Sequence, residues 1–340
     1  MAATLASTSR VSTRILLASA LAMLVGLVLW RLAHDWRALP AEALAAFHLD
    51  LGLLALAFGL QTLGWILVGL TWRAILGPEG AGLSLLRHLQ IHTLAGLAQV
   101  VPGSVWAPLG RLALYRRAGV GALAVSTGLV IELTLLGLAG LMLYGLSAPF
   151  VPVLPPGWAP WLGGLALLAA GLLHPRPFGA ILGLAWRRFG QGPMPRAPRT
   201  GQLARWFAGE LGVLGLSGCA LWLLMRAISP AASLPWAMGV WGLTVALANL
   251  LAWLPATSLL KDGGMVALLT PLYAGVLQEP GSALLVALGL TLAWRIWSLA
   301  VLLCWAAGSS VILRLRGEAE RERARAAIGP SEAALEVRRG

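Results

Sequence analysis

The sequence predicts an all-α polytopic membrane protein of about eight transmembrane helices, with a re-entrant hairpin and a second segment broken by proline. Composition gives the first reason: 59% of the 340 residues are hydrophobic, 11% are charged, and the mean hydropathy is +0.81. These values lie well outside those of soluble globular proteins. Several apolar runs also approach the roughly 20 residues that cross a bilayer. We therefore expect a transmembrane domain over residues 1–313 and a charged cytoplasmic tail over residues 314–340.

The expected spans follow the apolar runs in order along the chain. The first run comes after Arg10 and Arg14 and resembles a signal peptide, but no small-residue cleavage site follows, so we interpret it as an uncleaved span. A shorter, more polar stretch at residues 83–101 separates the second and third crossings. The expected crossings lie at residues 15–33, 51–72, 120–146, 158–173, 203–225, 234–253, 265–277 and 283–313.

The arginines set the orientation of these spans, because cytoplasmic loops carry an excess of basic residues. Residues 111–117 and 176–205 are rich in arginine and are expected inside, whereas residues 147–160 carry no charge and are expected outside. With these sides fixed, residues 83–101 must return to the side from which they came, as a re-entrant hairpin. Residues 265–277 must cross outward, although this run is short. Both termini are then cytoplasmic.

Two segments break a hydrophobic run with proline and then present polar and charged side chains. They cover residues 101–111 and 254–264. Non-helical backbone at membrane depth survives only inside protein or beside a water-filled cavity, and interrupted helices of this kind mark binding sites in transporters. We therefore expect both segments to line a polar cavity at mid-depth. The residues expected from them are Pro102, Gly103, Arg111, Pro255, Lys261 and Asp262.

Charged residues inside predicted spans also require an explanation, because each costs about 2.5–3.5 kcal/mol on insertion scales. Glu132 and Arg295 each lie in the middle of a span. One interpretation is that the two pair with each other and fix helix packing; the other is that they serve function. Lys261, the only lysine in the chain, and Asp262 are sequence neighbours. On a helix their side chains point roughly 100° apart, so they should face different partners.

These charges suggest a site for a phosphate group. Arginine meets phosphate with a planar fork and lysine with a point charge, so Arg111, Lys261 and Arg295 are the expected phosphate-binding residues. Helices that begin after the two proline breaks would add backbone N–H donors. Glu132 and Asp262 would balance charge or hold a cationic group. The expected partner is a membrane lipid with a phosphate head group, together with a glycosyltransferase or lipid synthase.

Other chemistry is less well supported by the sequence. His88 and His92 share a helix face and could bind a metal, but no third ligand is evident, so we favour interfacial histidines. We expect no cofactor, no metal and no catalytic residue. We also expect no nucleic acid as a partner, because the arginines lie beside membrane spans and serve to orient them. The alternative is a membrane transferase acting on a lipid-phosphate substrate through an acid such as Asp35 or Glu42, or an accessory partner of such a transferase.

The chain resembles the transmembrane domain of lysylphosphatidylglycerol synthase and its stand-alone flippase-like relatives. Residues 101–111 and the basic follow-on at 115–120 resemble the most specific motif of that family, and Glu132 and Arg295 fall where the family has charged residues in its spans. The second motif is altered, because residues 256–258 replace glycines and lysine-aspartate replaces arginine-glutamate. The resemblance implies a flippase-like protein of a bacterial-type inner membrane that binds or translocates an anionic phospholipid or polyprenyl-phosphate lipid. It implies lipid translocation rather than lipid synthesis, because the soluble aminoacyl transferase domain of bifunctional relatives is expected to be missing.

Overall fold

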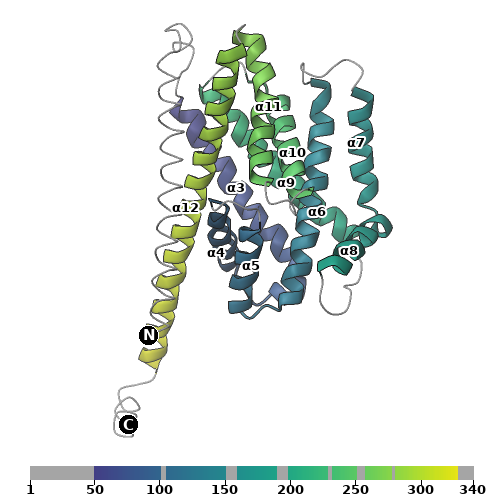
Figure 1. Ribbon diagram of the computed structural model, residues 1–340. Helices are drawn as coiled ribbons and strands as arrows, with labels where there is room; N and C mark the ends of the chain where they lie inside the picture. Colours follow the sequence, from purple (N-terminus) through teal and green to yellow (C-terminus); the bar gives the residue numbers. More distant parts are fainter. Residues whose placement is uncertain are drawn as a thin grey trace, which may run out of the picture.

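The computed structural model describes residues 50–100, 105–150, 159–189, 198–228, 232–250, 257–277 and 280–327. This part of the chain is helical and contains no strand (Figure 1). The helices, separated by short turns, are α3 (Leu51–Leu76), η1 (Gly77–Gly80), α4 (Leu85–Gly96), η2 (Leu97–Val100), α5 (Trp106–Arg117), α6 (Ala122–Ser147), η3 (Ala148–Phe150), α7 (Ala159–Leu172), α8 (Pro175–Phe189), α9 (Thr200–Ile228), α10 (Leu234–Leu250), α11 (Thr257–Leu277) and α12 (Pro280–Ala327).

Four helical segments among the described residues are long and apolar enough to cross a membrane. They are Leu51–Gly80, Ala122–Phe150, Thr200–Ala227 and Gly281–Gly317. The prediction of an all-helical chain with membrane-length apolar helices is therefore confirmed. The eight crossings and the re-entrant hairpin stay predictions, and the expected first span at residues 15–33 lies outside the described residues.

The long helices form a bundle in which segments distant in sequence pack side by side. α3 begins at its cap, where the Asp50 side chain accepts hydrogen bonds from the backbone N–H groups of Gly52 and Leu53. The Asp50 N–H donates to the carbonyl of Ala227, which joins the start of α3 to the end of α9. α3 packs along α9, and α6 packs along α10. The core lies between these pairs and includes Leu135, together with buried residues of α9, α10 and α12.

Glycines let α6 and α10 approach each other closely. A Cβ atom at Gly140 would lie 2.5 Å from the carbonyl oxygen of Gly242 and 2.9 Å from the backbone nitrogen of Ala246. Small residues at such crossings are typical of helix packing in membranes, where close contact replaces the hydrophobic effect as the force between helices.

α4 and α5 form a short antiparallel pair at one end of the bundle. Gly110, near the start of α5, lies against Ala95 near the end of α4, and Tyr115 at the far end of α5 contacts His88 near the start of α4. Each helix has 12 residues, or about 18 Å at 1.5 Å per residue, which is less than the thickness of a bilayer. In Figure 1 they lie at the end of the bundle that also holds the end of α3, the start of α6 and α8.

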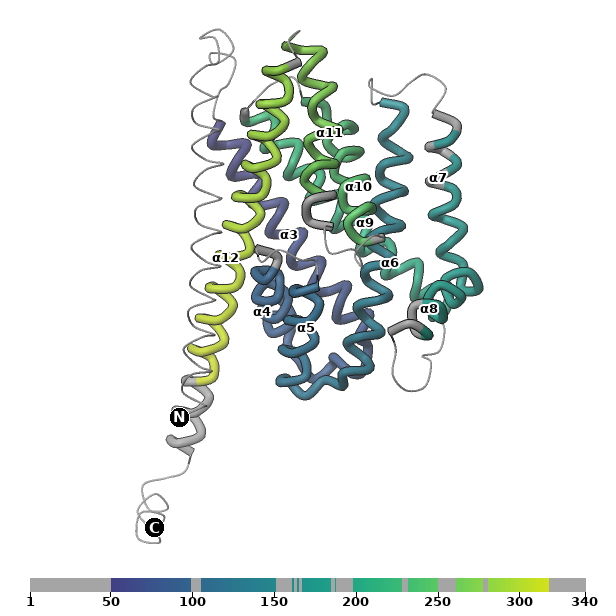
Figure 2. Tube along the Cα trace, in the orientation of Figure 1, coloured from purple at the N-terminus to yellow at the C-terminus, as the bar shows by residue number. Residues whose placement is uncertain are grey.

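The second proline-broken region differs from the expectation. The crossing expected at residues 265–277 is a 21-residue helix, α11, that begins at Thr257 and contains Lys261, Asp262 and, in its interior, Pro271. At about 31 Å it has the length of a membrane crossing. Hydropathy missed its first two turns because they carry the two charges. The last helix also exceeds its predicted end at residue 313: α12 continues to Ala327, and its lower part extends beyond the other helices in Figure 1. Figure 2 shows α12 running along one side of the bundle.

The α6–α10 contact predicts the effect of a single methyl group. Gly140→Ala should lower the melting temperature in detergent, because the new Cβ meets backbone rather than a movable side chain; overpacking of this kind costs about 1–3 kcal/mol. The matched control is Gly164→Ala in α7, where a Cβ meets nothing within 4 Å. Equal melting temperatures for the two variants would contradict the prediction, because they would mean that α6 and α10 can move apart without loss of stability.

The ends of α6 provide a test of orientation. Cysteines placed singly at Gly121, before α6, and at Phe150, which is exposed after it, should react with impermeant reagent from opposite faces of the membrane. The parent for this experiment has Cys219 and Cys304 replaced by serine, because Cys304 is itself exposed. Labelling of both positions from one face would contradict a crossing by α6.

Candidate functional site

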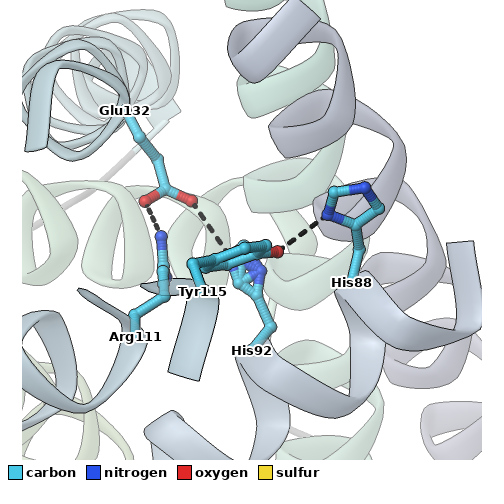
Figure 3. Close-up of polar contacts among 5 residues, drawn as sticks. All are labelled: His88, His92, Arg111, Tyr115 and Glu132. Atoms are coloured by element: carbon cyan, nitrogen blue, oxygen red, sulfur yellow. Dashed lines mark hydrogen bonds and ion pairs between the residues drawn. The ribbon is translucent and has the colours of Figure 1, made fainter. Parts of the chain in front are cut away.

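An ion pair joins α5 to α6 inside the bundle. Arg111 donates a short hydrogen bond through Nη1 to Oε2 of Glu132 (Figure 3). The Glu132 side chain is 4% exposed and that of Arg111 is 18% exposed. A charge this deep requires an opposite charge or a hydrogen bond, because transfer into an apolar interior removes its hydration. The pair therefore explains how an apolar helix such as α6 accommodates a carboxylate at mid-length.

His92 of α4 lies against the other carboxylate oxygen of the same glutamate. Its Nε2 is 3.8 Å from Oε1 of Glu132, which is too long for a hydrogen bond. The ring is buried, and neither of its nitrogens has a hydrogen-bond partner. Burial lowers the pKa of His92 well below its usual value, and the positive charge of Arg111 lowers it further. The imidazole is therefore neutral at pH 7, with unused hydrogen-bonding capacity beside Glu132.

Trp72 of α3 forms the platform for this cluster. The Cζ atom of Arg111 lies 4.7 Å from the centroid of the indole ring, a cation–π distance. The rings of His92 and Tyr115 pack against the same indole, with centroids 5.2 Å and 5.8 Å away. Gly128 of α6 makes room for the ring, since a Cβ there would lie 3.0 Å from it. One fully buried side chain thus positions groups from α4 and α5 and packs against α6.

A chain of hydrogen bonds continues from this platform to the loop after α3. The Nδ1 atom of His88 is 2.8 Å from the hydroxyl of Tyr115, and its Nε2 is 3.2 Å from the carbonyl oxygen of Gly80. A carbonyl only accepts, so Nε2 carries the proton and the tyrosine hydroxyl donates to Nδ1. Burial lowers the pKa of His88, which keeps the ring neutral. Both of its nitrogens are engaged, so in this arrangement His88 offers none to a metal.

A second buried acid, Glu210 of α9, belongs to the same region. It is 2% exposed and lies within electrostatic range of both Glu132 and Arg111. Sequence reasoning did not single it out. The signal was present, since Glu210 is an acid inside the predicted span at residues 203–225, the same kind of signal that identified Glu132.

The other charged group lies where α11 meets α12 and α10. Arg295 donates from Nη1 to Oδ2 of Asp262 over 2.9 Å, and the Lys261 ammonium lies 4.8 Å from the centroid of the Trp241 ring. The prediction that Lys261 and Asp262 face different partners is therefore confirmed. The Arg295 side chain is 52% exposed.

The structure assigns the expected site residues to two groups. The suggested pairing of Glu132 with Arg295 is wrong, because Glu132 pairs with Arg111 and Arg295 pairs with Asp262. Packing distributes these charges among four different helices, which their sequence positions could not reveal. Contact of Arg111, Lys261 and Arg295 with one phosphate stays a prediction. Three of the expected residues lie outside the described residues: Pro102, Gly103 and Pro255.

The two groups differ in their charge balance. Lys261, Asp262 and Arg295 contain two basic groups and one acid, so the group is net positive when all three are ionised. Arg111, Glu132 and Glu210 contain one basic group and two acids, so that group is net negative. An anion is therefore attracted to the first group, and a proton or another cation to the second.

A cavity of about 360 Å³ opens between the last turns of α3 and the first turns of α6. It extends from Glu79 and Gly121 to Thr127, Gly128 and Ile131, the residue before Glu132. The Thr127 hydroxyl is buried and has no hydrogen-bond partner. The cavity thus reaches from one end of the bundle toward the buried acids.

Comparison of this chain with known protein families, curated proteins and solved structures gives no match. The site is therefore interpreted from its own geometry.

The Arg111–Glu132 pair predicts a characteristic pattern of stability. Arg111→Gln and Glu132→Gln should each lower the melting temperature strongly, because breaking a buried pair leaves one charge uncompensated at a cost of about 3–5 kcal/mol. The double variant should melt above both single variants, since neither charge remains.

The matched control for this pattern is Arg117→Gln. Arg117 is an exposed residue in the last turn of α5, and its loss should leave the melting temperature near that of the parent. Parent-like melting of Arg111→Gln would contradict a structural ion pair.

Proposed function

We propose that this chain is a flippase-like membrane protein that binds the phosphate head group of an anionic lipid and moves it across a bacterial-type inner membrane. The observation that carries the proposal is the net-positive group of Lys261, Asp262 and Arg295 within the apolar length of α12 and the start of α11. Its natural ligand is an anion that is already in the membrane, and phosphate-bearing lipids supply that chemistry.

The position of Arg295 favours a ligand that arrives from the lipid. Arg295 lies on an outward-facing stripe of α12 together with Leu288, Ile296 and Leu303, all of them exposed apolar side chains. A basic residue on the apolar face of a membrane-length helix is costly, about 2.5–3.5 kcal/mol on insertion scales. Asp262 offsets one positive charge of the group, and the remaining one is available to a lipid phosphate.

The donors in this group suit phosphate. Arg295 offers a planar guanidinium fork, and Lys261 offers a compact ammonium group on a flexible stem. Lys261 also lies in the second turn of α11, which begins at Thr257, so the positive end of that helix points toward the same region. The acyl chains of the lipid would remain in the bilayer while the head group enters between α11 and α12.

The distribution of helix ends supports a cytoplasmic location for one end of the bundle. The ends of α3 and α5 carry Arg73, Arg116 and Arg117, and they lie at the same end of the bundle as α8 and the arginine-rich continuation of α12 (Figure 1). This is the arrangement that the positive-inside rule associates with the cytoplasm. Both chain termini would then be cytoplasmic.

The test is reconstitution of the purified protein in liposomes that contain a fluorescent anionic phospholipid. Lys261→Gln and Arg295→Gln should each reduce transbilayer movement roughly tenfold to a hundredfold, because hydrogen bonds to charged groups contribute about 1.5–3 kcal/mol. Their melting temperatures should stay near that of the parent.

The matched control is Arg314→Gln, an exposed arginine lower on the same helix, which should move lipid at the parental rate. Parental rates in Lys261→Gln and Arg295→Gln would contradict the proposed site. The same liposomes are analysed for chemically altered lipid, and product formation without transbilayer movement would favour the transferase alternative.

A further inference from the structure

We propose that Arg111, Glu132, Glu210 and His92, here called the buried acid cluster, bind one exchangeable proton. This proton site is separate from the net-positive group of Lys261, Asp262 and Arg295, here called the lipid-binding group. The argument for the proton site does not depend on a lipid. It would give the protein a way to couple the movement of its substrate to a proton gradient.

The charge balance of the cluster is the first support. Glu132 and Glu210 are both buried, at 3% and 2% exposure, and Arg111 is the cation within electrostatic range of both. With both carboxylates ionised and His92 neutral, the cluster has one uncompensated negative charge. An isolated charge in an apolar interior costs several kcal/mol, and the binding of one proton removes that cost. One proton on a carboxylate oxygen makes the cluster neutral.

The second support is the unused hydrogen-bonding capacity of His92. Its ring is buried and its nitrogens lack hydrogen bonds, yet Nε2 points at Glu132 from 3.8 Å. Buried polar atoms are nearly always paired, so the unpaired ring nitrogen is placed to form a hydrogen bond with a protonated Glu132 after a small approach. A neutral imidazole both accepts and donates a hydrogen bond, so it can pass a proton to or from the carboxylate.

The third support is the cavity between α3 and α6, which runs along the part of α6 that carries Glu132. Its lining includes Thr127 and Ile131, which lie within two turns of Glu132 on the same helix. Its mouth, at Glu79 and Gly121, lies at the end of the bundle that carries the arginines. Protons would therefore enter from the proposed cytoplasmic side.

Few other ionisable groups face this cluster. From α5, Tyr115 lies across Trp72; from α4, His88 binds Tyr115; and from α3, Arg73 is close enough to influence His88. Helix α10, which packs against both α6 and α9, contains no ionisable residue. In the described part of the chain, His88 and Tyr115 bind each other, so the two glutamates and His92 are the groups in this region with oxygens or ring nitrogens able to accept a proton.

The experiment is an infrared difference spectrum of the purified protein in liposomes of neutral lipid, recorded between alkaline and acidic buffer. A protonated carboxylic acid has its own carbonyl band, which an ionised carboxylate lacks. We expect this band to appear as the pH falls through the neutral range in the parent. Glu210→Gln should remove it, and this variant leaves the Arg111–Glu132 pair intact, so its fold is checked by a parental melting temperature.

Asp262→Asn is the matched control, because Asp262 is another carboxylate within the membrane part and belongs to the lipid-binding group. Its spectrum should keep the band. Loss of the band in Asp262→Asn but not in Glu210→Gln would overturn the assignment, as would a band present at every pH, which indicates a fixed structural proton. A band that responds to sodium at constant pH would also overturn it, because the ligand would then be a metal cation.

Failure of the proton site and failure of the proposed function can be told apart. The spectrum requires no transported lipid, and the translocation assay requires no pH change. If the cluster is coupled to transport, Glu210→Gln should also abolish the dependence of lipid movement on an imposed pH gradient. Lipid movement in the parent that ignores such a gradient would overturn the coupling.

Discussion

The cost of burying charge in an apolar bundle is the constraint on which the rest of this structure depends. Arg111 and Glu132 meet this constraint together, and their pairing ties the short helix α5 to the long helix α6. The Trp72 ring packs against the Arg111 guanidinium, so α3 contacts the same ion pair. This contact is one of several that hold the α4–α5 pair in the bundle, since α4 also packs against α3 and α12.

The same constraint separates two kinds of site within one bundle. Around Arg295 one positive charge is not balanced by an acid, and the Arg295 side chain is half-exposed on the outside of α12. Around Glu132 one negative charge is not balanced by a base, and the side chains of Glu132 and Glu210 are buried. An exposed positive group is accessible to a lipid head group, whereas an enclosed negative group suits a proton or another small cation. The proposed lipid site and the proposed proton site thus lie on different helices, the first on α11 and α12 and the second around α5, α6 and α9.

Much of the site was within reach of the sequence. An acid or a base inside an apolar run is costly and needs a partner or a function. This reasoning identified Glu132, Lys261, Asp262 and Arg295. It also predicted that Lys261 and Asp262 have different partners, since that follows from helix geometry alone. The same reasoning applies to Glu210, an acid inside the apolar run at residues 203–225, but no proline break marks its position. The start of α11 was missed because the charges in its first turns lower the local hydropathy.

The sequence by itself determined that the chain is helical and apolar enough for a membrane, where α3 begins, and which charges need partners. Only the tertiary structure decided which residues are the partners of these charges. Arg111 meets Glu132 across 21 residues, and Gln90 meets Ser310 across 220, so the pairings depend on which helices lie side by side. Periodicity fixes the direction of a side chain relative to its own helix, but the neighbour it meets is set by close packing between helices, as where Gly140 meets Gly242.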